Sequence, residues 1–96
     1  MKVVRAAIKF KQLNCQNTEY KIRYGWRHGT IFQEMFADGI QYDKSDYQTG
    51  FLVDDRPLHF VTREEAAKIA YESGQVKELK DTIYSEDLWT AEGHLI

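Results

Sequence analysis

Cysteine and proline are scarce in this sequence of 96 residues. Cys15 is the only cysteine, which excludes an intramolecular disulfide framework and a zinc site built from several cysteines. Because Cys15 lies in a polar segment with no histidine nearby, we expect a bystander rather than a nucleophile. Pro57 is the only proline, and neither a linker nor an internal repeat is visible. The length therefore predicts one domain, residues 1–96.

No sign of charge dominates, and no long apolar run occurs. Thirteen basic residues oppose fifteen acidic ones, a net charge of −2, so general DNA or RNA binding is not expected. No apolar run approaches the about 18 residues that span a bilayer. The apolar stretch at the start is too short for a signal peptide. We therefore expect no membrane contact and a cytoplasmic location.

Apolar and polar residues alternate over residues 2–11 and again over residues 20–26. A period of two is typical of a strand with one buried face. The apolar face of the first segment holds Val4, Ala6, Ile8 and Phe10, and its polar face holds Arg5, Lys9 and Lys11. One face of the second segment holds Tyr20, Ile22, Tyr24 and Trp26. We predict two antiparallel strands joined by a turn at residues 14–17.

Two later segments have helical spacing. From His28 onward, apolar residues recur with the period of a helix that ends at Gly39, at positions Ile31, Phe32, Met35 and Phe36. A second helix is predicted to begin after Thr62, whose side chain and that of Glu65 match a capping box. This helix should end at residues 71–73, with Gly74 in the left-handed position that follows a helix.

The remaining segments complete the predicted fold. Residues 43–46 are polar and indicate a loop, and residues 51–53 and 58–61 flank a polar turn, as in a β-hairpin. Residues 76–83 are expected to form a loop or a short helical turn, and residues 84–89 to dock through large apolar side chains. The order is β-β-α-β-β-α, an α+β fold with a small, mainly antiparallel sheet of about four strands packed with two helices.

Four motifs in this order resemble a family of small, largely uncharacterised bacteriophage and prophage proteins. They are Ala6-Ala7-Ile8-Lys9-Phe10, Arg27-His28, Phe60-Val61-Thr62-Arg63-Glu64-Glu65-Ala66 and Ser85-Glu86-Asp87-Leu88-Trp89. Members of the family show Ala-Ala-Ile-x-Phe, Arg-His, Phe-Val-x-Arg-x-Glu-Ala and Ser-Glu-Asp-Leu before Trp or Tyr. The resemblance implies a phage-encoded protein in the host cytoplasm. Small phage proteins are often directed against host defence, and some bind or destroy nucleotide signals.

Arg27 and His28 stand where a strand should give way to a helix. A helix N-terminus favours phosphate, Arg27 adds a guanidinium fork, and His28 adds a donor or a general base. Alternatively, His28 caps the helix and Arg27 pairs with an acid. Arg63 at the start of the second helix is a further candidate phosphate ligand, although it could instead find a carboxylate partner.

Ser85, Glu86 and Asp87 form an acidic step before the final tryptophan. A carboxylate here could bind a ribose hydroxyl or orient His28. Alternatively, Ser85 caps a final helical turn, with both acids in its first turn. No metal or cofactor is expected, because the three histidines lack ligand spacing and no glycine-rich phosphate loop occurs.

Three functions from different classes remain open. The leading hypothesis is a phage-type protein that binds a small phosphorylated or nucleotide-like ligand through Arg27, His28, Arg63 and Ser85–Asp87, and so sequesters a host-defence signal. The second is a small hydrolase or phosphodiesterase with His28 as general base. The third is a protein-binding inhibitor without a small ligand. A homo-oligomer is compatible with each, because a small sheet leaves open edges.

Overall fold

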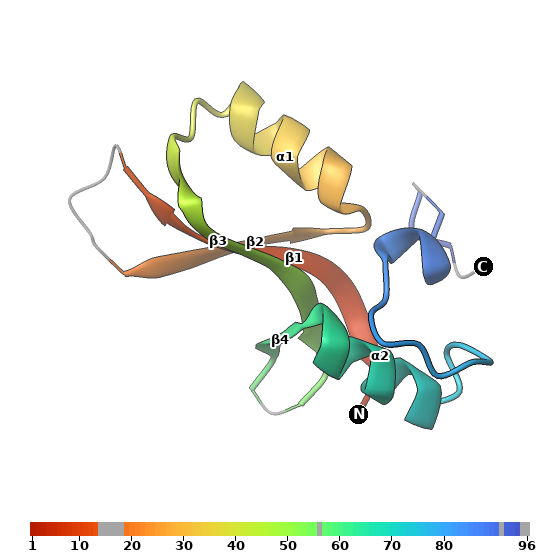
Figure 1. The fold of residues 1–96 in the computed structure, drawn as a ribbon. Helices are drawn as coiled ribbons and strands as arrows, with labels where there is room; N and C mark the ends of the chain where they lie inside the picture. Colours follow the sequence, from red (N-terminus) through yellow and green to blue (C-terminus); the bar gives the residue numbers. More distant parts are fainter. Residues whose placement is uncertain (14–18, 56, 91, 95–96) are drawn as a thin grey trace.

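Four antiparallel strands form one sheet in the computed structural model, which describes residues 1–13, 19–55, 57–90 and 92–94. The strands lie in the order β2-β1-β3-β4 (Figure 1), with the bounds β1 (Val3–Gln12), β2 (Tyr20–Gly25), β3 (Tyr42–Val53) and β4 (His59–Thr62). The helices are α1 (His28–Ala37), α2 (Arg63–Glu72) and the short 3-10 helix η1 (Ser85–Asp87). This confirms the predicted α+β class and element order. The predicted turn at residues 14–17 and Cys15 lie outside the described residues.

The alternation in β1 places Ala6, Ile8 and Phe10 in the core, as predicted. The prediction was wrong for Val4, which is only half-buried, whereas Val3 is fully buried. The cause is a bulge: the register against β3 shifts between Val3 and Arg5. A bulge adds one residue to one strand and so reverses the alternation beyond it.

Helix α1 follows its predicted period only in part. Ile31 and Met35 are buried against the sheet, and Gly39 adopts a positive φ of 71° just after the helix. Phe36 was expected on the same apolar face, but 87% of its surface is exposed. The buried side of this short helix is therefore narrower than the sequence pattern indicated.

Helix α2 begins as its sequence predicts. The Glu65 amide donates to Thr62 Oγ1 at 3.2 Å, and the Thr62 amide donates to Glu65 Oε1 at 3.3 Å, which completes the capping box. The helix buries three small side chains, Ala66, Ala67 and Ala70. Gly74, with a φ of 80°, follows its end.

The predicted loop at residues 43–46 is wrong, because β3 runs through it. Asp43 Oδ1 does accept loop-like hydrogen bonds from the amide and hydroxyl of Ser45. On either side, however, Tyr42 and Tyr47 hold the segment to the sheet, since their rings lie 5.6 Å apart and Tyr42 packs on Phe10 at 6.1 Å. A second register shift, between Phe10 and Gln12, accommodates the polar residues.

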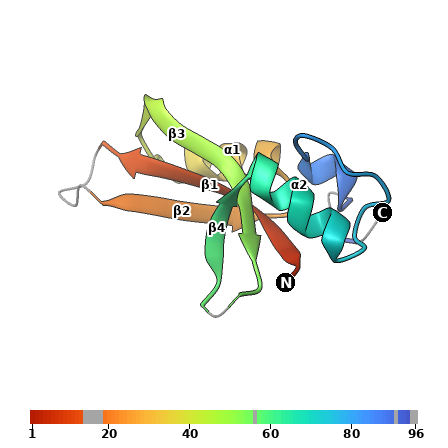
Figure 2. The same cartoon turned by 60° about the horizontal axis from the view of Figure 1, so that its bottom comes forward.

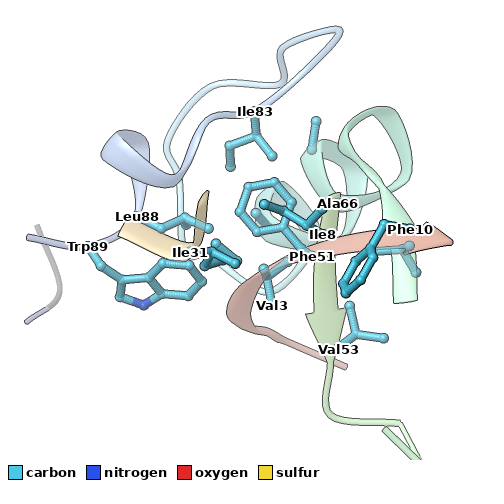
Figure 3. Close-up of a cluster of buried hydrophobic side chains, with 14 of the residues drawn as sticks. Val3, Ile8, Phe10, Ile31, Phe51, Val53, Ala66, Ile83, Leu88 and Trp89 are labelled. Carbon is cyan, nitrogen blue, oxygen red and sulfur yellow. The ribbon is translucent and has the colours of Figure 1, made fainter. Parts of the chain in front are cut away.

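The segment after α2 docks on the sheet end where β1 begins, and there the core is completed. Gln75 accepts from the Val3 amide and donates to the Val3 carbonyl, which joins this segment to β1. Figure 2 shows the chain after α2 turning back beside the start of β1. Residues 76–83 form no regular helix. Leu88 and Trp89 converge on Phe51 in the core (Figure 3), so the docked tail is confirmed, although Tyr84 is exposed.

Candidate functional site

Four segments that are distant in the sequence meet where the two helices begin. The His28 amide donates to Ser85 Oγ at 3.5 Å, and Arg63 Nη2 donates to His28 Nδ1 at 3.3 Å. His28 Nε2 lies 2.7 Å from the carbonyl oxygen of Gly50 in β3. We call this group of His28, Gly50, Arg63 and Ser85 the His28 junction. It links α1, β3, α2 and η1.

His28 uses both of its ring nitrogens inside this junction. A guanidinium can only donate, so Nδ1 is the acceptor and Nε2 carries the proton that it donates to Gly50. Only 7% of the His28 surface is exposed, and its ring lies edge-on to the Phe51 ring at 5.2 Å. No lone pair is left to accept a proton from a substrate. The geometry therefore does not favour the general-base interpretation.

The electrostatics of His28 agree with this arrangement. Burial lowers the pKa of the imidazole, the hydrogen bond to Gly50 partly opposes that effect, and the nearby charge of Arg63 lowers the pKa further. The ring is accordingly neutral at pH 7, with the ordinary histidine value of 6.5 as reference. A neutral ring is also what the hydrogen bond from Arg63 to Nδ1 requires.

Arg63 connects several elements, and in the part of the chain that the structure describes it has no carboxylate partner, contrary to the alternative considered from the sequence. Its Nε donates to Thr49 Oγ1 at 2.9 Å, and its Nη1 donates to the Ile83 carbonyl at 2.9 Å. Its guanidinium also lies 5.0 Å from the exposed Tyr84 ring and 5.9 Å from the Phe51 ring. Arg63 thus ties the start of α2 to β3 and to the segment before η1.

Arg27 occupies the N-cap position of α1, but its side chain does not cap the helix. Its Nη2 donates to the Trp89 carbonyl at 3.2 Å, while its buried Nε has no hydrogen-bond partner among the described residues. His28 therefore does not cap α1, and Arg27 forms no ion pair with an acid among the described residues, so the structure does not show the alternative interpretation. The first turn of α1 contains no acidic residue, and Gly29 and Thr30 are exposed. This helix N-terminus is open to solvent.

Ser85, Glu86 and Asp87, the acidic step before Leu88 and Trp89, make different contacts. Ser85 is buried and faces His28, so it does not cap η1. Asp87 Oδ2 instead accepts from the Tyr84 amide at 3.0 Å, and Lys80 Nζ lies 3.6 Å from Asp87 Oδ1. Glu86 is exposed. The structure thus brings His28, Arg63 and Ser85 together, with Arg27 beside them. Asp87 instead forms its hydrogen bond at the start of η1.

A second cationic surface, the uncovered face of the sheet, was not predicted from the sequence. The register pairs Lys9 with Ile22 and Ala7 with Tyr24, so the polar face of β1 and the aromatic residues of β2 share this side. We call it the open sheet face, made of Arg5, Ala7, Lys9, Lys11, Tyr20, Ile22, Tyr24, Gln48, Leu52 and Phe60. The signal was present in the alternation, but the register that unites the strands is not readable from one sequence.

The described residues contain no group of three or more histidine, cysteine, aspartate or glutamate side chains arranged to hold a metal. Among the helices in the described part of the chain, none has the length and apolarity needed to cross a membrane.

Comparison with known proteins places the chain in a phage family. No curated protein and no solved structure matches it. The family model described as Phage T4 y16D protein matches residues 2–89, a range that includes both helices, all four strands and the His28 junction. The chain therefore belongs to the Phage T4 y16D protein family.

Proposed function

We propose that this phage-family protein binds a small phosphorylated, nucleotide-like ligand and does not cleave it. The observation that carries the proposal is the open N-terminus of α1 beside Arg27. Amide groups in the first turn of a helix have no partner within the helix and carry partial positive charge, which favours phosphate. In a phage protein, such binding would sequester a nucleotide signal of host defence.

The two helices of the protein differ in a way that supports this assignment. At α2, Thr62 and Glu65 satisfy the first amides, and Glu64 adds a second negative charge. At α1, by contrast, Ser85 Oγ accepts from the His28 amide, but the N-cap side chain accepts from no amide and no acid lies in the first turn. Arg27 adds a fixed positive charge there. The hydrogen bond from Arg27 to the Trp89 carbonyl orients the guanidinium, and its buried Nε has no hydrogen-bond partner among the residues that the structure describes.

The environment of His28 supports the proposal of binding without cleavage. A hydrolase of the kind considered from the sequence needs His28 to accept a proton, but Arg63 already occupies its free lone pair. His28 and Arg63 therefore act as positioning residues, because they hold the start of α1 against β3 and α2. Tyr84, exposed beside Arg63, is the aromatic ring available to stack on a base.

Replacing Arg27 by alanine should weaken phosphate binding by about 1.5–3 kcal/mol, the scale of a lost hydrogen bond to a charged group. Calorimetric titration would use inorganic phosphate, nucleoside triphosphates and cyclic dinucleotides as probes. Arg23→Ala is the matched control, because it removes the same charge from an ion pair with Asp38 at the other end of α1. Equal affinities for wild type and Arg27→Ala, or no binding of any probe to wild type, would contradict the proposal.

A second candidate function rests on a separate observation, an apolar hollow between α1 and β3. It measures about 680 Å³, and its walls include Leu13, Phe32, Phe36, Ile40, Tyr42 and Tyr47. Exposed apolar patches rimmed by polar residues are typical of protein interfaces. This surface supports the protein-binding alternative, for which Phe36→Ala would abolish capture of a host protein and leave Arg27-dependent titrations unchanged.

A further inference from the structure

We propose that the open sheet face binds single-stranded nucleic acid. This surface is distinct from the N-terminus of α1, so the proposal goes beyond the phosphate site and does not depend on it. Its centre is β1, which carries Arg5, Lys9 and Lys11 on this side. Aromatic rings on β2 and β4 flank these cations.

Lys9 is placed between two of those rings. Its Nζ lies 5.1 Å from the centre of the Tyr20 ring and 6.0 Å from that of Phe60. Lys9 forms no ion pair with an acid anywhere in the described part of the chain. On the adjacent strand, Tyr24 is 62% exposed, and Ile22 between the two tyrosines is also exposed. The face thus presents an available ammonium group among accessible rings.

Two hollows on this face could each receive a single base. Ala7 and Gly50, paired in the register, are both buried, and the Phe60 ring lies against Gly50. A hollow of about 410 Å³ lies beside Arg5, Tyr24 and Leu52. A smaller hollow of about 120 Å³ is lined by Lys9, Tyr20, Asp46 and Gln48.

The charges on this face select the ligand. The chain as a whole has a net charge of −2, and this balance led the sequence analysis to expect no general nucleic-acid binding. The open sheet face nevertheless carries three cations. Two acids lie near Lys11: Asp46, which is 3.8 Å from its ammonium group and accepts from the Tyr20 hydroxyl, and Asp43. Cations between aromatic rings match a ligand that alternates phosphates with flat bases.

A duplex does not fit this surface. Its bases are stacked on one another and offer only their edges, so Tyr20 and Tyr24 could not stack on them. An unpaired strand exposes the faces of its bases while its phosphates reach the cations of β1. The occupant is therefore a short unpaired segment, and the rings make no hydrogen bonds that would demand one sequence.

The test is fluorescence anisotropy with a labelled oligonucleotide of about ten nucleotides in low salt, as RNA, as DNA and as a duplex. Tyr24→Ala should weaken binding of the single strand about 5- to 150-fold, the range for loss of one stacked base. Lys9→Gln should reduce the slope of log affinity against log salt by about 0.7, the value for one phosphate of a single strand. Tyr71→Ala and Lys68→Gln make the same changes at exposed positions on α2.

Circular dichroism and thermal melting would verify that each variant is folded. Loss of binding in the two sheet variants, with binding retained in the two α2 variants, supports the proposal, and the RNA and DNA arms show which sugar is preferred. No saturable binding to wild type, tighter binding of the duplex, or equal affinities for all four variants would overturn it. Because Arg27 lies outside the open sheet face, phosphate titrations of Arg27→Ala test the other proposal separately.

Discussion

Replacing Phe51 by alanine is expected to lower the free energy of unfolding by about 3–5 kcal/mol, the usual cost of removing a buried phenyl ring. None of the Phe51 surface is exposed. Its ring lies 5.2 Å from the His28 ring and 6.2 Å from the Trp89 ring, so it joins the junction to the docked tail. Removing it leaves a cavity where β3, α1 and the tail meet. Denaturant unfolding followed by circular dichroism measures the effect.

Phe36→Ala is the matched control, because it deletes the same side chain from the exposed side of α1. It should change stability by no more than about 0.5 kcal/mol, as surface substitutions usually do. Equal losses for the two variants would show that Phe51 does not hold the core together.

Replacing His28 by alanine should cost about 2–4 kcal/mol, because it deprives two groups of their partner. The Gly50 carbonyl and Arg63 Nη2 would each lose a hydrogen bond in a poorly hydrated place, and a buried unsatisfied group costs about 1–3 kcal/mol. His59→Ala, which removes an exposed imidazole, is the control. If His28→Ala kept full stability, the junction would not be the structural link described here, and a chemical role for His28 would regain support.

Wild type and His28→Ala can also be compared at different pH values, and the direction in which their stability difference changes can be predicted. The pKa of His28 is lowered in the folded protein, so below the ordinary value of 6.5 the unfolded chain binds more protons than the folded one. The contribution of neutral His28 to stability is therefore complete above pH 6.5 and declines as the pH falls below it. The stability difference between wild type and His28→Ala should accordingly be larger at about pH 7.5 than at about pH 5.5. A difference that grows on acidification would contradict the assignment.

Local patterns were sufficient to predict most of the fold. The period of two in residues 2–11 gave the buried face of Ile8 and Phe10, and the capping box at Thr62 and Glu65 gave the start of α2. These features depend on interactions within a few residues. The sequence also indicated that the tail docks, because Leu88 and Trp89 are too apolar to remain in solvent.

The errors arose where distant contacts decide the structure. Because of a single bulge, Val3 lies in the core where Val4 was expected, and the alternation of residue types does not predict this bulge. Residues 43–46 are polar and form turn-like hydrogen bonds, but packing of Tyr42 and Tyr47 keeps them in β3. Tertiary packing often overrides local preference in strands in this way.

The candidate site was predicted as a set of residues but not as an arrangement. The motifs indicated that His28, Arg63 and Ser85 matter, and the fold brings them together across separations of 35 and 57 residues. Their hydrogen-bond partners include the carbonyl groups of Gly50 and Ile83, which carry no side-chain signal in the sequence. For that reason the sequence could not show whether these residues act as a general base, as ligands of a phosphate or as structural links between elements.

The most direct test of ligand binding without cleavage is native mass spectrometry of the protein purified from bacterial cells. We expect an adduct with the mass of a phosphorylated small molecule, which is released intact on denaturation. Arg23→Ala should retain this adduct, and Arg27→Ala should lose it. A bare protein mass for wild type, an adduct that Arg27→Ala retains in full, or release of cleavage products in place of the intact molecule would contradict it.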